Sequence, residues 1–137
     1  SDHAPHTLEE KARPYPQSPS GMPMVQTMVP IMLNHINKGR LTLNRFVELV
    51  GEGPRRVFGC LTKGRIEKGL DADFTLVDMK KEMTITNDWI ESRSGWTPFD
   101  GETVTGWPVI TIVGGKIVMK DGELKAPQGR PVQFTEV

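Results

Sequence analysis

The sequence predicts an α/β protein in which helices come first and a small antiparallel β unit follows. Apolar residues recur at three- and four-residue steps within residues 24–38, which is typical of one buried helix face. After Cys60 the period falls toward two residues, as in half-buried strands. The pairs Gly114-Gly115 and Asp121-Gly122 have the composition of tight turns that join neighbouring strands.

Three helices are expected in the first part of the chain, over residues 24–38, 42–50 and 54–58. Pro30 lacks a backbone N–H and predicts a kink or a restart in the first of them. Thr42 has the side chain of an N-cap, and Gly51 is a natural end for the helix that follows. Pro54 suits the first turn of the third helix.

Before these helices, residues 7–23 contain four prolines and predict a long polar loop. Later in the chain, four strands are expected, over residues 72–77, 83–86, 108–113 and 116–119. Three tryptophans of this second part are expected to pack in a core or at an interface: Trp89, Trp96 and Trp107. The change in pattern places a boundary near residue 60.

Composition narrows the function classes. The chain has 137 residues, about one domain, with 17 basic and 17 acidic residues and a formal net charge of zero. No broad basic face for nucleic acid is therefore expected. No apolar run approaches the roughly 20 residues of a membrane span, so no membrane partner is expected either. One cysteine, Cys60, excludes an internal disulfide and predicts a reducing, cytoplasmic location.

The chemically richest stretch is the first one, where Asp2, His3 and His6 fall within five positions. A carboxylate and imidazoles are groups that serve as general bases and as zinc ligands. The alternative is that they are turn-forming or hydrogen-bonded structural residues. A zinc site needs three or four protein ligands, and this stretch alone does not supply a convincing set. A polar cluster at the first residues also predicts that the chain is the C-terminal part of a longer protein.

The opening Asp2–Lys11, read as DHAPHTLEEK, closely resembles the end of the catalytic barrel in dihydroorotases, a cyclic-amidohydrolase branch of the amidohydrolase superfamily. Three later segments follow in the family's order: SGMP at 20–23, GRIEKGLDAD at 64–73 and WTPFDG at 96–101. The resemblance covers nearly the whole chain. Its first piece is highly specific, whereas GRIEKGLDAD marks only the superfamily.

This resemblance implies a (β/α)8 TIM barrel with a small antiparallel β-sandwich. Residues 1–60 would be the end of the barrel, with its last strand, a loop and helices. Residues 61–137 would be the C-terminal part of the sandwich. Asp2 would then lie at the C-terminal end of the eighth barrel strand, where such barrels place their chemistry.

The resemblance also implies roles for four residues. Asp2 would contact the metal centre and act as general base, taking a proton from the metal-bound hydroxide and returning one to the leaving amide nitrogen. His6 would bind the substrate carboxylate, and backbone groups near Ser20 and Gly21 would bind the dihydropyrimidine ring. The reaction would be the reversible cyclisation of N-carbamoyl-L-aspartate to L-dihydroorotate in pyrimidine biosynthesis. Zinc, one or two ions, would be held mostly by residues outside this chain.

Two departures from the family pattern bear on activity. Ser20 stands where the family loop often has proline, which predicts a less rigid loop. The chain contains no His-x-His pair, and the family's carbamylated lysine, other metal histidines and substrate-binding arginine are also missing from it. The isolated chain is therefore expected to bind zinc poorly and to be inactive.

Several alternatives stay open. The substrate could be a dihydropyrimidine, a hydantoin or allantoin instead of dihydroorotate, although an imidazole aimed at a carboxylate favours dihydroorotate. The protein could be a non-catalytic scaffold related to dihydroorotases. It could also be an independent α/β domain without enzymatic ancestry. The expected partners are the small-molecule substrate and further copies in a homo-oligomer, with aspartate transcarbamoylase as a second candidate partner.

Overall fold

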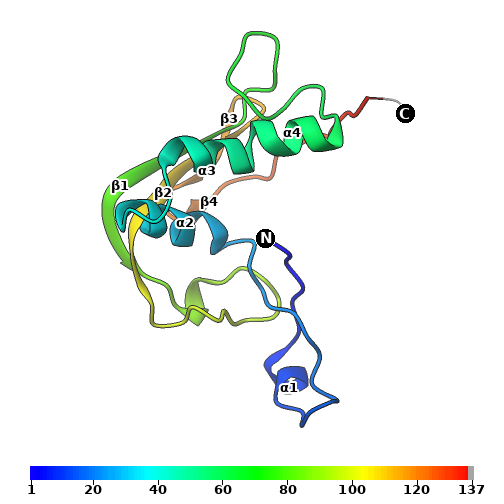
Figure 1. Cartoon of the computed structure of the whole chain (residues 1–137), viewed down its shortest axis with the longest axis vertical. Coiled ribbons are helices and arrows are strands. Elements are labelled where there is room, and N and C mark those ends of the chain that lie inside the picture. The colour runs from blue at the N-terminus through cyan, green and yellow to red at the C-terminus, as the bar shows by residue number, and fades with distance from the viewer. Residues whose placement is uncertain (136–137) are drawn as a thin grey trace. The chain divides into compact units, whose positions relative to one another are not determined.

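The computed structural model describes residues 1–135, and its ribbon is shown in Figure 1. It confirms an α/β chain in which helices precede strands, and a short 3-10 helix, η1, lies between the first two strands. The elements are α1 (Leu8–Lys11), α2 (Met28–Asn37), α3 (Leu43–Val50), α4 (Glu52–Phe58), β1 (Phe74–Thr84), η1 (Asn87–Trp89), β2 (Thr103–Val113), β3 (Lys116–Lys120) and β4 (Glu123–Leu124).

The chain divides into two compact units. The first comprises residues 1–34 and 79–107, and the second comprises residue 35 to residue 78 and the chain from residue 108 onward. The residues of α2, β1 and β2 are divided between the two units. The predicted boundary near residue 60 separates the end of a barrel from part of a sandwich in a larger protein. The two units do not test it, and it stays a prediction.

Helix boundaries follow local capping chemistry. The Thr42 hydroxyl accepts a hydrogen bond from the Arg45 N–H at 3.2 Å, which confirms Thr42 as the N-cap of α3. Helix α2 begins at Met28, four residues later than predicted, so Pro30 lies in its first turn, where a missing N–H costs nothing. Helix α4 begins at Glu52, two residues before the predicted start at Pro54. Pro54 therefore also lies in a first helical turn, where its missing N–H has no partner within the helix to lose.

Residues 7–23 were predicted to be a loop throughout, but they contain the short helix α1. The Thr7 hydroxyl accepts from the Glu10 N–H at 3.2 Å, and the Glu10 carboxylate accepts from the Thr7 N–H at 3.0 Å. This reciprocal pair is a capping box, and its Thr-x-x-Glu spacing is visible in the sequence. The prolines that predicted a loop all lie after α1 ends at Lys11.

The strands are longer than expected. β1 runs unbroken over Phe74–Thr84, so the expected separate strand at residues 83–86 was wrong. β2 begins at Thr103, five residues before the predicted start, and it includes the buried Trp107. The four strands form one sheet in the order β1-β2-β3-β4.

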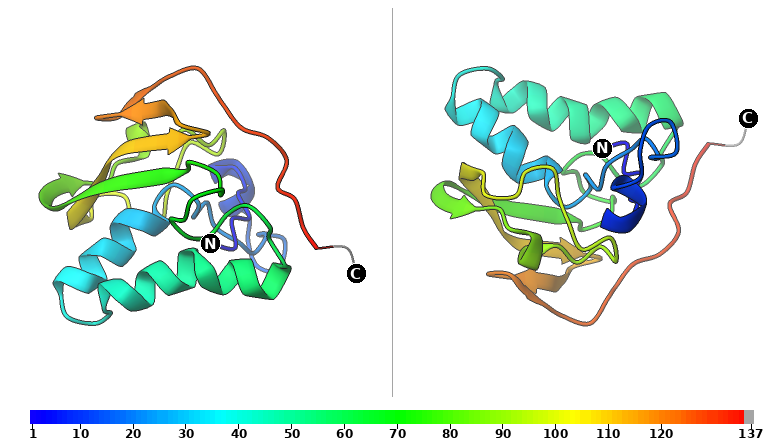
Figure 2. Two further views of the ribbon diagram at one scale, coloured as in Figure 1. Left: turned by 90° about the horizontal axis from the view of Figure 1, so that it is seen from above. Right: turned by 90° about the horizontal axis from the view of Figure 1, so that it is seen from below.

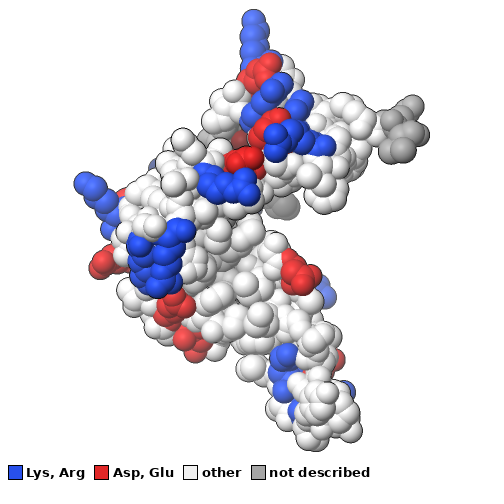
Figure 3. All heavy atoms as spheres, in the orientation of Figure 1, with Lys and Arg blue, Asp and Glu red and all other residues white. Residues whose placement is uncertain are grey.

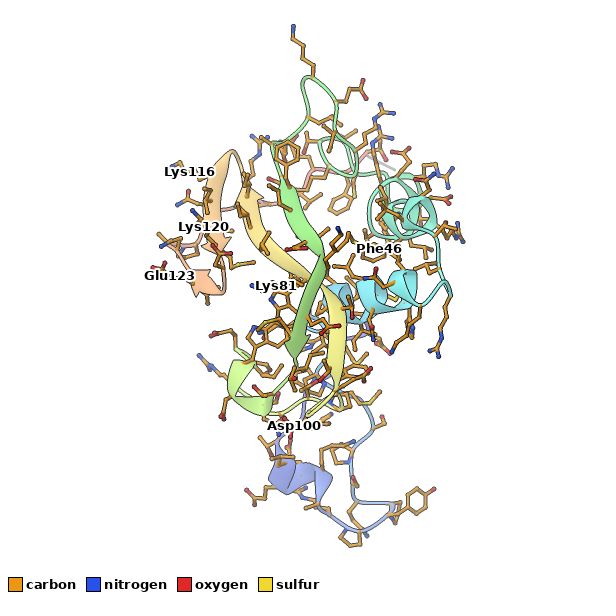
Figure 4. The ribbon with its side chains drawn as sticks, turned by 90° about the vertical axis from the view of Figure 1, so that its left-hand side faces the viewer. Phe46, Lys81, Asp100, Lys116, Lys120 and Glu123 are labelled. Atoms are coloured by element: carbon orange, nitrogen blue, oxygen red, sulfur yellow. The ribbon has the colours of Figure 1, made fainter. Side chains whose placement is uncertain are left out.

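Both predicted turns join antiparallel neighbours. Val113 pairs with Lys116 across Gly114 and Gly115, whose φ angles are 57° and 78°. Lys120 pairs with Glu123 across Asp121 and Gly122, whose φ angles are 51° and 86°. Two successive positive φ angles match the twist of a two-residue hairpin, which confirms the prediction. Figure 4 shows Lys116 and Lys120 on β3 and Glu123 on β4.

The first unit has a small apolar core. Ile85 and Val104 are fully buried, and Trp107 is 5% exposed. The ring centroids of Trp89 and Trp107 lie 4.7 Å apart with an interplanar angle of 47°. This confirms the packing role predicted for these two tryptophans.

In the second unit, α3 and α4 follow one another nearly in line (Figures 1 and 2). Phe46 of α3, labelled in Figure 4, is buried. Basic and acidic side chains lie beside one another over this part of the surface in Figure 3, and Arg45 lies 2.6 Å from the Glu48 carboxylate. Within residues 1–135, none of the helices has the length and apolar character needed to cross a bilayer.

Candidate active site

The first unit brings the beginning of the chain against the loop at residues 20–23. His3 forms an isolated parallel β-bridge with Met22, and the Ala4 N–H donates to the Met22 carbonyl at 3.1 Å. Gly21 has a φ of +93°, and a Cβ added there would come within 2.7 Å of both the Cβ and the carbonyl oxygen of Ala4. Only glycine therefore fits at position 21 in this arrangement. The structure thus places the segment carrying Asp2 beside the loop carrying Gly21.

His3 has a structural role in this arrangement. Its Nδ1 accepts hydrogen bonds from the backbone N–H groups of Met24, at 3.0 Å, and Val25, at 3.2 Å. An accepting Nδ1 requires the neutral ring with its proton on Nε2. These bonds orient the backbone just before α2, so His3 matches the alternative of a hydrogen-bonded histidine.

Asp2 is exposed and has a φ of +47°. Aspartate is one of the few residues that tolerates this left-handed conformation, because its short side chain can bond locally. Among residues 1–135, no hydrogen bond or ion pair to the Asp2 carboxylate is found. The carboxylate is therefore open to a ligand.

His6 is half-buried, and its Nδ1 lies 3.4 Å from the Glu10 carboxylate. The pKa of Glu10 is lowered, mainly because the Thr7 backbone N–H donates to its carboxylate, and His6 adds to this effect. Because Nδ1 faces Glu10, Nε2 is the ring nitrogen left for a substrate group. The backbone of His6 is held separately, since its carbonyl accepts from the Trp96 indole N–H at 2.6 Å.

A lysine that sequence reasoning left without a role organises the loop. Lys11 Nζ donates to the Pro19 carbonyl at 2.7 Å and to the Gly21 carbonyl at 3.2 Å. In return, the Ser18 hydroxyl donates to the Lys11 carbonyl at 3.0 Å. Ser20 is exposed between the two carbonyls that Lys11 holds. Lys11 belongs to the motif at residues 2–11, but nothing in its spacing marks these contacts.

The described residues do not form a complete metal centre. No group of three or more histidine, cysteine, aspartate or glutamate side chains is gathered in a metal-binding arrangement within residues 1–135. Zinc sites usually take three or four protein ligands, and here Asp2 is the one exposed, unengaged carboxylate of the initial cluster. The donor set therefore does not fit a self-sufficient zinc site, and Asp2 could supply one ligand at most.

A second cluster of charged groups lies within the second unit and includes none of the predicted site residues. The Asp71 side chain is 8% exposed and contacts Arg130, Lys63 at 3.1 Å and the Thr62 hydroxyl at 3.0 Å. These contacts, with Arg130 the largest contributor, lower the pKa of Asp71 to about 2. Asp73 adds a bond from the Gly114 N–H at 2.7 Å, which fastens the β2–β3 turn. These contacts join residues of the second unit to one another, so we interpret the cluster as one that stabilises the fold.

The sequence is similar to those of curated dihydroorotases. It is 42% identical to the dihydroorotase of Methanothermobacter thermautotrophicus over 95% of this chain and 30% of the relative. It is 46% identical to the dihydroorotase of Pyrococcus furiosus over 90% of this chain and 29% of the relative. The chain thus spans about 30% of the length of these relatives.

Solved structures of cyclic amidohydrolases resemble the fold. An L-hydantoinase from Arthrobacter aurescens superposes with a TM-score of 0.77 at 37% identity, over 80% of this chain and 25% of that one. A dihydropyrimidinase from Brevibacillus agri gives a TM-score of 0.83 at 28% identity, over 90% of this chain and 28% of that one. The model of the amidohydrolase family matches residues 4–118, most of the chain. The chain therefore belongs to the amidohydrolase family.

Proposed function

We propose that this chain is part of a dihydroorotase, which interconverts N-carbamoyl-L-aspartate and L-dihydroorotate. The observation that carries the proposal is the similarity to curated dihydroorotases, at 42% to 46% identity over at least 90% of the chain. The geometry supports it, because the segment that begins with Asp2 is bridged to the loop of Ser20 and Gly21. A carboxylate and a backbone-rich loop are what a cyclic-amide substrate would require.

We further propose that the whole protein is a (β/α)8 barrel with a small β-sandwich. In that arrangement residues 1–60 end the barrel and residues 61–137 contribute to the sandwich. The solved relatives, with TM-scores of 0.77 and 0.83, support a shared fold. The C-terminal ends of barrel strands carry the chemistry in such enzymes, and Asp2 would occupy one of those ends.

In the proposed reaction Asp2 moves protons. Its carboxylate accepts a proton from the attacking water when the ring opens, and it delivers a proton to the amide nitrogen that leaves. Two observations support this role. The carboxylate is exposed and unengaged among residues 1–135, and the residue has a φ of +47°. Uncommon backbone conformations persist where the surroundings fix them, and they concentrate at active sites.

His6 and the loop would bind the substrate. We propose that Nε2 of His6 donates to the substrate carboxylate, since Nδ1 faces Glu10. The backbone of Ser20 and Gly21 would contact the ring. Ring peptide groups and loop peptide groups have matching donors and acceptors, so this contact suits any six-membered cyclic amide.

Zinc is the cofactor we propose for the complete protein. Ligands besides Asp2 would come from outside residues 1–135, because the described residues do not form a set of three. A homo-oligomer and an association with aspartate transcarbamoylase are also proposed, and a cytoplasmic location stays a prediction from the single cysteine.

Turnover by the complete gene product tests the proposal. With Asp2→Ala, kcat for dihydroorotate should fall by about 10²- to 10⁴-fold, as expected for loss of a general acid–base group. The Asp2 carboxylate makes no hydrogen bond or ion pair within residues 1–135, so the variant should keep the wild-type fold, as checked by circular dichroism. Unchanged turnover in this variant would remove Asp2 from the mechanism. A wild-type protein that never acts on dihydroorotate would exclude the proposed substrate.

A second candidate, a hydantoinase or dihydropyrimidinase, is favoured by the solved structures of such enzymes. His6 separates the two functions, because an imidazole for a carboxylate serves dihydroorotate but not an uncharged ring. A panel of dihydroorotate, dihydrouracil and hydantoin, measured as kcat/KM, decides between them. A preference for the uncharged rings would support the second candidate.

A further inference from the structure

We propose that Lys11 is a positioning residue, whose ammonium group holds the Ser20–Gly21 loop in the conformation that binds the substrate ring. This inference rests on the proposed function, since it concerns the same site. Lys11 Nζ donates to the carbonyls of Pro19, at 2.7 Å, and Gly21, at 3.2 Å. These two carbonyls flank Ser20, so one cation fixes the peptide groups on both sides of it.

Local hydrogen bonds fix the position of Lys11. It is the last residue of α1, and the capping box between Thr7 and Glu10 sets the first turn of that helix. The Ser18 hydroxyl donates to the Lys11 carbonyl at 3.0 Å, so main chain and side chain of the lysine both contact the loop. The Lys11 side chain is half-buried, which strengthens its hydrogen bonds relative to those in open solvent.

The loop is therefore held from two sides. On one side, Gly21 lies so close to Ala4 that a Cβ would come within 2.7 Å of it, and the Ala4 N–H donates to the Met22 carbonyl. On the other side, only the Lys11 ammonium bonds the carbonyls of Pro19 and Gly21 among the described contacts. Hydrogen bonds to a charged donor are about twice as strong as neutral ones. Removing the charge should loosen the loop and leave the Ala4 side in place.

A contact that positions the loop predicts a particular kinetic pattern. Every cyclic-amide substrate would use the Ser20–Gly21 backbone, whereas only a carboxylate-bearing substrate would use His6. Lys11→Met should therefore raise KM by about tenfold for dihydroorotate and by the same factor for dihydrouracil. kcat should change by less than about threefold, because the reacting groups are untouched.

The test uses the complete gene product with three variants. Lys11→Met removes the cation, Lys11→Arg keeps a cationic donor and should recover part of the KM change, and Lys38→Met is the control. Lys38 is an exposed residue just beyond the end of α2. KM and kcat are measured for both substrates. Hydrogen exchange of the Ser20, Gly21 and Met22 amides is measured without substrate. It should become fastest in Lys11→Met, rise less in Lys11→Arg and stay unchanged in Lys38→Met.

Each outcome decides the inference. A parallel rise in KM with faster exchange of the loop supports it. Unchanged exchange overturns it whatever the substrate, and so does a KM effect confined to dihydroorotate, which would make Lys11 a direct ligand of the carboxylate. If the wild-type protein opens only other cyclic amides, the proposed function fails. The KM of Lys11→Met for those amides then still tests the positioning role.

Discussion

The close approach of Gly21 to Ala4 predicts that Gly21→Ala will open the junction between the start of the chain and the loop. The φ of Gly21 is +93°, a conformation that an alanine adopts only with strain. The new Cβ would also lie 2.7 Å from the Cβ and from the carbonyl oxygen of Ala4, and one of these two atoms is backbone. Neither can move aside without shifting the chain.

Two costs add up at this position. Backbone strain at a positive φ costs about 1–3 kcal/mol for a non-glycine residue. Overpacking against a fixed neighbour costs about another 1–3 kcal/mol. Local opening should therefore become easier by about 2–6 kcal/mol, which is at least about a 30-fold loss of protection against hydrogen exchange if opening is local. The sensitive reporter is the Ala4 amide, which donates to the Met22 carbonyl at 3.1 Å.

Gly69 offers a matched control, because its φ is +96° and nothing lies within 4 Å of a Cβ placed there. Gly69→Ala carries the strain without the collision and should leave exchange of the Ala4 amide at the wild-type rate. Exchange is followed by NMR or mass spectrometry on the complete gene product. Equal protection of Ala4 in wild type and Gly21→Ala would show that the contact does not hold the loop.

Three more predictions follow from separate sites. His6→Ala should raise KM for dihydroorotate by about tenfold while leaving uncharged rings unaffected, since only a carboxylate uses the imidazole; equal losses on both would contradict it. Ile85→Ala should lower stability by about 2–5 kcal/mol, measured by thermal unfolding, because Ile85 is fully buried. Asp71 is deprotonated in the folded state down to about pH 2, against an ordinary pKa of 3.8, so its stabilisation is present above pH 3.8 and declines toward pH 2. Asp71→Asn should flatten this acid limb in pH-dependent unfolding, and an unchanged limb would rule out the cluster as its source.

The parts of the fold that the sequence predicts well are those decided within a few residues. Thr42 caps α3 through its own hydroxyl, and the two glycine-containing pairs make hairpins because they accept positive φ angles. The unbroken β1 was missed for a tertiary reason. Its middle contains Lys80 and Lys81, which interrupt the apolar alternation. β1 is the first strand in the order of the described sheet, and edge strands tolerate such charges.

At the candidate site, too, contacts between residues far apart in the sequence could not be predicted. Asp2 and His6 were recognisable because they belong to one short motif. Lys11 and Trp96 were not, because their partners lie elsewhere: Trp96 donates to the His6 carbonyl across 90 residues of sequence. No periodicity or spacing encodes a contact of that length. A tryptophan expected to pack in a core therefore also holds the backbone of His6, the residue that we propose to bind the substrate carboxylate.

The histidines of the opening cluster show why composition alone overstates a metal site. His3 and His6 lie three positions apart, yet their Nδ1 atoms have different partners. Nδ1 of His3 accepts from two backbone amides, and Nδ1 of His6 faces Glu10. A metal ligand must offer a free lone pair, and the amides bonded to Nδ1 of His3 already occupy that pair. The same two bonds fix the backbone beside Asp2, whose carboxylate stays unengaged among the described residues. His3 thus positions its neighbour Asp2, the residue that we propose for proton transfer.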